Sequence, residues 1–149
     1  MYSKILVPTD GSSLSEQAAE SAIEFARAVG GEIVALSVAQ PYPMIAAEAV
    51  VVVDTQAETR VLLEQAQQHV DKVAQLAAKA GVACSGSTGL SYFPHEEIIK
   101  AELDHHCDLI FMGSHGRHGL SKLLAGSVTQ NVLAYSSIPV LVLRPGGLH

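Results

Sequence analysis

The chain has 149 residues, of which 48% are hydrophobic and 16% are charged, and its formal net charge is −6 at pH 7. This length suits one packed core, so we expect a single domain over residues 1–149. The acidic balance argues against a nucleic-acid partner, which needs a basic face, although a local pocket for a small anion stays possible. No window approaches the about 20 apolar residues of a membrane span, and the apolar run after Met1 is too short for a signal sequence. We therefore expect a cytoplasmic protein that does not bind membranes.

The first quarter of the chain alternates between an apolar run and helical periodicity. Residues 4–10 (KILVPTD) are an apolar run stopped by a Pro-Thr-Asp sequence, which is typical of a buried strand. Residues 12–31 then repeat small apolar residues at helical spacing, with Ser12 or Ser13 as N-cap and two glycines at the end. Residues 32–39 predict a second strand, after which two prolines interrupt the pattern.

The middle of the chain contains one ambiguous segment. In residues 45–54 (IAAEAVVVVD), the valine run Val50–Val53 fits either a strand or a loop that packs apolar side chains on the body. We favour a loop or lid that leads into a long helix from Thr55 to Ala80, which Gly81 ends. Residues 82–89 then predict a weaker strand.

The last third of the chain repeats the same alternation. A helix is predicted from Pro94 through residue 106, with two glutamates in its first turn, where the helix dipole favours them. Residues 107–113 are the most hydrophobic predicted strand, residues 127–136 a short helix, and residues 138–144 (IPVLVLR) a final strand.

Strands separated by helices are expected to be parallel, with right-handed crossovers and helices on both faces of the sheet. We therefore predict an α/β fold with a five-stranded parallel sheet in the order 3-2-1-4-5. The winding of such a sheet reverses between strands 1 and 4, and ligands bind outside the carboxyl ends of the strands at that reversal. Strand 1 ends at Pro8, Thr9 and Asp10, and strand 4 ends at Met112 and Gly113, so these segments are expected to border a crevice.

The glycine-rich segment MGSHGRHGLSKLLAGSVTQNVL (residues 112–133) begins at this predicted crevice. Gly113, Gly116 and Gly126 leave backbone N–H groups uncovered, and such groups can surround a phosphate. The residues from Ser127 to Thr129 would present the N–H groups of a helix N-terminus, and the hydroxyls of Ser127 and Thr129 can add donors. The side chains of Arg117 and Lys122 are within reach of outer phosphates. The segment therefore predicts a site for a phosphate chain.

The spacing Gly113-x2-Gly116-x9-Gly126-Ser127 resembles the ATP-binding motif of the universal stress protein family. The opening ILVPTDGS (5–12), the stretch DLIFMGSHGRHG (108–119) and the closing strand resemble that family too, so the likeness spans essentially the whole chain. It implies a Rossmann-like fold of the adenine nucleotide alpha hydrolase-like type, and it places the chain among the members that bind ATP.

The resemblance also implies roles for individual residues. Asp10 would lie beside the ribose and phosphates, Val38 beside the adenine, and Met112 and Gly113 along the base and ribose. The phosphates would be surrounded by His115 and the residues that follow it in the motif. The full predicted set is Pro8, Thr9, Asp10, Val38, Met112, Gly113, Ser114, His115, Gly116, Arg117, Gly126, Ser127, Val128 and Thr129.

Several enzyme classes are disfavoured by the sequence. It has no G-x-G-x-x-G after the first strand, no G-x4-GK[ST] and no G-x-S-x-G, and no spacing typical of a protein metal site. Any Mg²⁺ would come with the phosphates of ATP. We therefore expect a nucleotide-binding regulatory module rather than an enzyme, with at most slow ATP hydrolysis assisted by Asp10 or His115.

Three functional interpretations remain open. The first is an ATP-binding stress-response protein that acts as a dimeric sensor or switch with an unidentified protein partner, in which ATP organises residues 40–54 and 113–126. The second is an interaction module that works without a nucleotide. The third and weakest is a receiver domain, for which VPTDGS offers Asp10 but no acidic pair. A backbone cradle would not distinguish ATP from ADP or AMP.

The final strand, Ile138–Arg144, is predicted to be an edge of the sheet. A long apolar edge is prone to pair with another chain, and pairing with the same strand of a second copy would give a two-fold homodimer, as the family resemblance also implies. The alternative is that Pro139 and the following PGG tail protect the edge within one chain.

Overall fold

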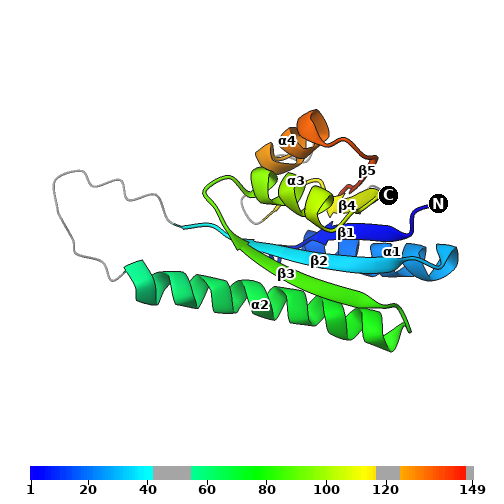
Figure 1. Cartoon of the computed structure of the whole chain (residues 1–149), viewed down its shortest axis with the longest axis horizontal. Helices are drawn as coiled ribbons and strands as arrows, with labels where there is room; N and C mark the ends of the chain where they lie inside the picture. The colour runs from blue at the N-terminus through cyan, green and yellow to red at the C-terminus, as the bar shows by residue number, and fades with distance from the viewer. Residues whose placement is uncertain (42–54, 117–124, 147–149) are drawn as a thin grey trace.

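Strands and helices alternate along the residues that this computed structural model describes, which are 1–41, 55–116 and 125–146 (Figure 1). In chain order they are β1 (Lys4–Pro8), α1 (Ser13–Val29), β2 (Glu32–Ala39), α2 (Thr55–Lys79), β3 (Cys84–Leu90), α3 (Pro94–Asp104), β4 (Leu109–Gly113), α4 (Ser127–Tyr135) and β5 (Val140–Leu143). The predicted order of elements is therefore confirmed. The strand-or-loop alternative for residues 45–54 lies outside the described residues.

The strands form one parallel sheet in the order β3-β2-β1-β4-β5, which confirms the predicted topology. Residue Ile5 of β1 is paired with Ile33 of β2 on one side and with Leu109 of β4 on the other. The winding reverses between β1 and β4, so the carboxyl ends of these two strands lie next to each other at the place where α/β sheets bind ligands.

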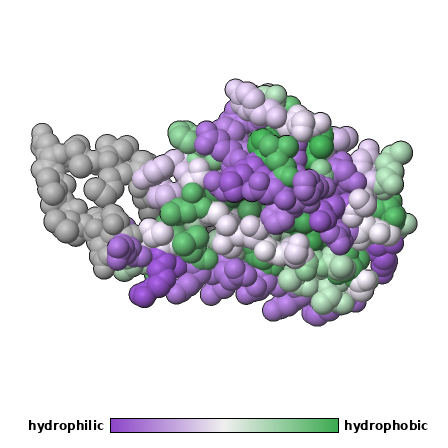
Figure 2. All heavy atoms as spheres, in the orientation of Figure 1, coloured by the Kyte–Doolittle hydropathy of each residue, from purple (hydrophilic) through white to green (hydrophobic). Residues whose placement is uncertain are grey.

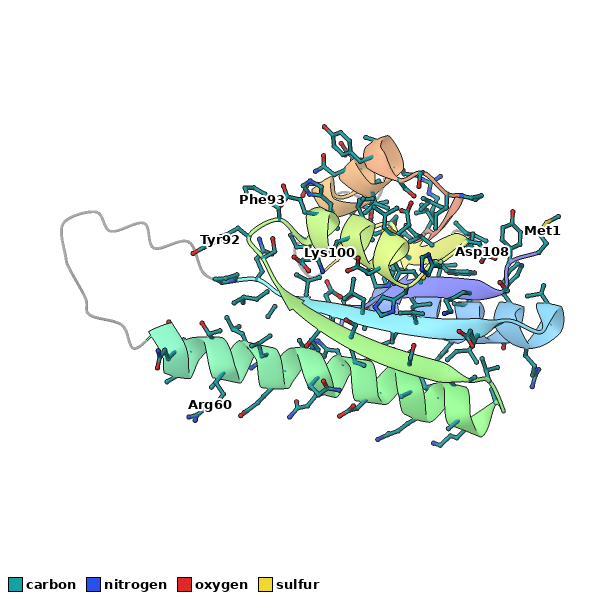
Figure 3. The ribbon with its side chains drawn as sticks, in the orientation of Figure 1. Met1, Arg60, Tyr92, Phe93, Lys100 and Asp108 are labelled. Carbon is teal, nitrogen blue, oxygen red and sulfur yellow. The ribbon has the colours of Figure 1, made fainter. Side chains whose placement is uncertain are left out.

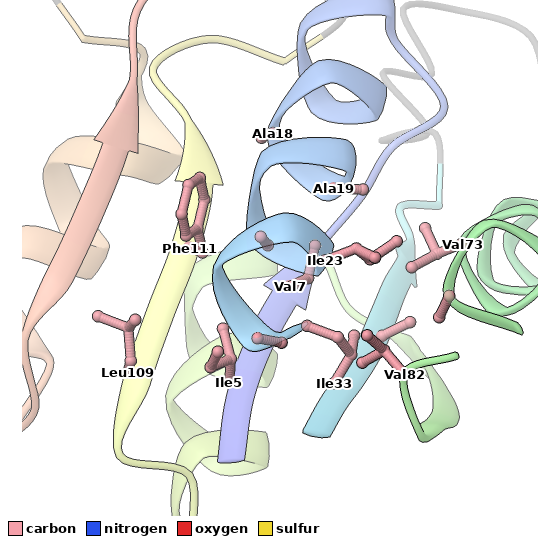
Figure 4. Packing of buried hydrophobic residues seen from close by; sticks show 14 of the residues in the cluster. Ile5, Val7, Ala18, Ala19, Ile23, Ile33, Val73, Val82, Leu109 and Phe111 are labelled. Atoms are coloured by element: carbon pink, nitrogen blue, oxygen red, sulfur yellow. The ribbon is translucent and has the colours of Figure 1, made fainter. Parts of the chain in front are cut away.

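Two hydrophobic clusters, one on each face, hold the helices on the sheet. Ile5 and Val7 of β1 face the cluster formed with α1 and α2, whereas Leu6 faces the cluster formed with α3 and α4. Figure 4 shows the first cluster, in which Ile23 of α1 and Val73 of α2 lie over the strands. Because both faces are covered, the inner strands are continuous apolar runs rather than alternating ones.

Small residues let the helices approach the sheet closely. The inner side of α1 is dominated by alanines, and on the edge strand β3 the space that a Cβ of Gly86 would need is occupied by Cγ1 of Val70 in α2. This packing explains why residues 82–89 gave only a weak strand signal: β3 is rich in serine and glycine because a helix presses on one of its faces, and much of the strand is exposed.

The predicted helix ends are largely confirmed. Ser12 is the N-cap of α1 and accepts a hydrogen bond from the Ser15 N–H, and Gly30 ends the helix in the left-handed conformation at φ 75°. Several predicted elements were one to three residues too long. The first strand, for example, ends at Pro8 rather than residue 10, because the chain turns away from the sheet after Thr9 donates its N–H to Leu36 at 2.8 Å.

The surface of the described residues is mixed, and hydrophilic side chains line the outer side of α2 (Figure 2). Among these residues no helix combines the length and the apolar character needed to cross a bilayer.

Candidate functional site

The loops that follow β1 and β4 meet at the carboxyl edge of the sheet. The β1 loop carries Asp10, and the β4 loop carries Gly116. An oxygen of the Asp10 carboxylate, Oδ2, occupies the space that a Cβ on Gly116 would need. Glycine at position 116 is therefore required for this approach, and the structure brings together two residues that the sequence predicted to share a site.

Hydrogen bonds within the turn and at the start of α1 fix the β1 loop. The Asp10 carboxylate accepts the N–H of Ser12 at 2.9 Å, and the hydroxyl of buried Thr9 lies 3.1 Å from that of Ser15. Gly11 follows in the left-handed conformation at φ 77°. Asp10 therefore stabilises the turn by accepting a backbone N–H two residues further on, as aspartates commonly do in turns, and its carboxylate also faces the glycine loop.

The β4 loop is fixed at the base of the glycine-rich segment. Ser114 is buried; its N–H donates to the carbonyl of Leu143 in β5 at 2.8 Å, and its own carbonyl accepts the N–H of Gly126 at 2.8 Å. The two ends of the glycine loop are thereby joined directly, and residues 115 and 116 are presented beside the start of α4.

The N-terminus of α4 opens onto the same place. Gly126 is the N-cap and has extended backbone angles, φ −65° and ψ 166°, with no side-chain cap for the N–H groups of the first turn. Those groups and the positive end of the helix dipole are suited to bind an anion. The helix start is held against β4 because the Thr129 hydroxyl donates to the carbonyl of Gly113 at 3.0 Å.

His115 carries an unsatisfied polar atom at this loop. Its Nδ1 lies 2.9 Å from the Ser114 hydroxyl, whereas its Nε2 is buried and has no hydrogen-bond partner among the described residues. Buried polar atoms are nearly always paired in native proteins. The imidazole therefore has a hydrogen-bonding position that a ligand oxygen would satisfy.

The remaining predicted residues differ in where the structure places them. Pro8, Met112 and Gly113 are the last residues of their strands, and Val38 and Val128 pack partly against the cluster under α3 and α4. The Thr129 hydroxyl, which was predicted to donate to the ligand, is buried and donates to the carbonyl of Gly113 in this structure. Ser127 is exposed at the first position of α4. Arg117 and Lys122 lie outside the described residues.

Sequence reasoning missed His69 of α2. Its ring fills the space beside Gly11: a Cβ there would lie 2.6 Å from Cδ2 and 2.9 Å from Cε1 of the imidazole. The Nδ1 atom lies 3.3 Å from the hydroxyl of Ser37 in β2. The available signal was a lone histidine beside the apolar stripe of a long helix, which more often indicates packing than a site.

A separate hollow of about 600 Å³ lies between the first half of α2 and β3, and it includes none of the predicted nucleotide-contacting residues. It is lined by Gln56, Thr59, Arg60, Leu63, Glu64, Gln67 and Thr88. Of these residues, Arg60 extends away from the sheet in Figure 3. Among the described residues there is also no group of three or more His, Cys, Asp or Glu side chains that could hold a metal ion.

The family model described as the universal stress protein family matches residues 1–144. The chain belongs to this family. It is 34% identical over 144 residues to universal stress protein MJ0531 of Methanocaldococcus jannaschii, covering 97% of this chain and 83% of that protein. It is 31% identical over 156 residues to universal stress protein MJ0577 of the same organism, covering 97% and 96%.

Solved structures of universal stress proteins share the fold. The structure of MJ0577 gives a TM-score of 0.83 at 32% identity and covers 99% of both chains. A universal stress protein in complex with cAMP gives 0.67 at 22% identity, covering 96% of this chain and 97% of that one. One from Archaeoglobus fulgidus in complex with dAMP gives 0.67 at 18% identity, covering 96% and 98%.

Proposed function

We propose that this universal stress protein binds an adenine nucleotide, ATP in particular, at the loops that follow β1 and β4. The observation that carries the proposal is the start of α4: a helix N-terminus next to a glycine loop, where neither the first-turn N–H groups have a side-chain cap nor the buried His115 Nε2 a partner among the residues that the structure describes. Both features favour a bound anion with oxygen acceptors. Two family members solved with cAMP and dAMP support an adenine nucleotide as the ligand.

The geometry suggests how the nucleotide would lie. The phosphates would accept the N–H groups of Ser127 and Val128 at the helix start, and the base would lie toward Val38 at the end of β2. Asp10, between them at the end of β1, would face the ribose or a Mg²⁺ ion that arrives with the phosphates. Since one carboxylate alone is a weak Mg²⁺ site, the phosphates would supply the other charged ligands.

We propose binding without efficient turnover. Of the two residues that could act as a base at this loop, Asp10 is tied to the turn by the Ser12 N–H, and the sequence has no G-x4-GK[ST] motif that would hold a γ-phosphate for attack. Such a site suits a sensor or switch whose surface changes with the nucleotide, which is the role we propose for the protein in the cytoplasmic stress response. A phosphate-release assay with purified protein checks this part directly.

Isothermal titration calorimetry with ATP tests the proposed site. Gly126→Val adds a side chain at the helix start, where a Cβ meets atoms of the described residues at 3.5 Å or more, and circular dichroism checks that the variant keeps the fold. We expect ATP binding to the wild type and at least about a tenfold loss in this variant, since several charged hydrogen bonds are blocked.

The matched control is Gly146→Ala, because a Cβ at this position has no neighbour within 4 Å in the described part of the chain. It should bind ATP like the wild type. Absence of ATP, ADP and AMP binding to the folded wild type would contradict the proposal and favour an interaction module that works without a nucleotide.

We also propose a homodimer formed through β5. This strand is the last of the sheet order, and Leu141 on it is 37% exposed. Its outer backbone groups have no neighbouring strand among the described residues, and antiparallel pairing with the β5 of a second copy would satisfy them.

A further inference from the structure

We propose that His69 is a positioning residue for the nucleotide site, which it supports from the far side of the β1 loop. The inference rests on the proposed function and assigns part of the affinity to a residue of α2 that lies outside the glycine motif. Three contacts carry it: Ser37 with His69, His69 with Gly11, and Asp10 with Gly116.

The first contact fixes the imidazole. His69 Nδ1 lies 3.3 Å from the hydroxyl of Ser37, which is 2% exposed and belongs to the rigid second strand. The neighbouring residue Val70 is buried and presses against Gly86 of β3, so the helix cannot shift at this turn without a clash. The ring is therefore held by a hydrogen bond and by the packing of its helix.

The second contact transmits that position to the β1 loop. The edge of the imidazole with Cδ2, Nε2 and Cε1 occupies the space where a side chain at Gly11 would begin. Gly11 has a φ of 77°, and the turn around it is held in place by the ring on one side and by α1 on the other. Without the ring, the backbone of this turn would gain room to move toward α2.

The third contact connects the β1 turn with the glycine loop at which the ligand is proposed to bind. Asp10 directly precedes Gly11, and its carboxylate lies against Gly116 of the phosphate-binding loop. A displacement of Gly11 therefore changes where Asp10 meets the glycine loop. Binding sites lose affinity when such supporting residues are removed, because the groups that touch the ligand are then less well preorganised.

The test compares ATP affinity, by calorimetry, among variants of His69 in the full chain. His69→Ala removes the contact with Gly11, and we expect it to weaken ATP binding about tenfold, because the groups that touch the ligand are then less well preorganised. The amide of Gln reaches as far as Nε2, whereas the amide of Asn reaches only Nδ1. His69→Gln should therefore restore more affinity than His69→Asn, although Asn can keep the Ser37 hydroxyl as a partner.

Gln68→Ala, at the adjacent exposed position, is the matched control and should bind like the wild type.

A double-mutant cycle with Gly11→Ala separates positioning from general stability. In the wild-type background, Ala at this position clashes with the ring; in His69→Ala that clash is gone and only the backbone strain remains. We expect Gly11→Ala to reduce ATP affinity at least about threefold less in the His69→Ala background than in the wild type.

The outcomes distinguish the two proposals. The role of His69 would be overturned, and the nucleotide site would stand, by any of three results. These are wild-type affinity in folded His69→Ala, equal affinities of the Gln and Asn variants, and an additive double-mutant cycle. A folded wild type that binds no adenine nucleotide would overturn the proposed function and this inference together.

Discussion

Asp108, just before β4, fastens the N-terminal segment to the sheet. Its carboxylate accepts the N–H of Ser3 at 2.8 Å, the N–H of Lys4 at 3.1 Å and the Ser3 hydroxyl at 3.1 Å. Figure 3 shows Asp108 on the side of the molecule where Met1 lies. Partial burial acts to raise the pKa of Asp108, but these hydrogen bonds together outweigh it and hold the pKa below its usual value.

We expect Asp108→Asn to lower the free energy of unfolding by about 1 kcal/mol at pH 7, at the low end for charged hydrogen bonds because the site is partly exposed. Since the folded-state pKa is lowered, the ionised carboxylate stabilises the fold above the unfolded pKa of about 3.9, and this contribution is lost as the pH falls through the folded pKa. Urea unfolding at pH 7 and at several lower pH values measures the difference between wild type and variant.

Glu24→Gln, at an exposed position of α1, is the control and should change the unfolding free energy little. A difference between wild type and Asp108→Asn that stays constant as the pH falls would show that the charge does not carry the effect.

At the scale of elements, one buried carboxylate ties α3 to the start of the last strand. Glu102 is 2% exposed. One of its oxygens accepts the N–H and the hydroxyl of Ser137, and the other accepts the hydroxyl of Ser136 at 2.8 Å. These serines form the turn between α4 and β5, so the carboxylate fixes where the edge strand begins.

We expect Glu102→Ala to destabilise the protein by about 2–4 kcal/mol, because it leaves several polar groups without their partner in a buried place. The loss should be concentrated at the edge of the sheet, so the amides of Val140–Leu143 should exchange with deuterium faster relative to those of β1. Leu103→Ala, at a 60% exposed position of the same helix, should leave that exchange unchanged. Equal acceleration in β1 and β5 would contradict the local role of Glu102.

The pattern of elements was predictable because local signals agreed with the fold. The apolar run containing Ile5 and Val7, the N-cap Ser12 and the terminal Gly30 each specify a strand, a helix start or a helix end without reference to distant residues. Predicted elements were too long where the residues beyond an end still resemble the element. Thr9, for example, lies beyond the end of β1, yet its N–H still donates to the carbonyl of Leu36.

The arrangement of residues at the candidate site was predictable where it follows from topology and glycine spacing, and not where it depends on distant partners. Asp10 and Gly116 come together because β1 and β4 are neighbours. Glu102 resembles a solvated helix residue, and its partners lie 34 and 35 residues away. The ring of His69 packs beside Gly11 on another element, which no local pattern of α2 indicates.

At the scale of the whole molecule, the proposed dimer depends on an edge of the sheet that lies opposite β3 (Figure 1). If the wild type forms the proposed dimer, we expect Leu141→Lys to make it monomeric at micromolar concentration, because the variant places a charge where the second copy would cover β5. Sedimentation equilibrium measures the change.

Val61→Lys is the control for this experiment, since Val61 is 50% exposed on α2, which packs on the β2–β3 side of the sheet. It should remain a dimer. A wild type that is monomeric at micromolar concentration would contradict the proposed assembly.

The central strands carry apolar side chains on both faces of the sheet, and this affects how the register of each strand is determined. A register shift of one residue would turn Ile5 and Val7 to the face now occupied by Leu6, and Leu6 to theirs. Because both faces are apolar, hydrophobicity alone does not determine which face of β1 packs against which helices. The two ends of the strand supply that information: an ion pair of 3.2 Å between Lys4, the first residue of β1, and Glu32, and the polar turn after Pro8. The residues that fix the β1 loop would then also fix the register of the strand. A one-residue slip would misplace this loop before it disturbed the hydrophobic core.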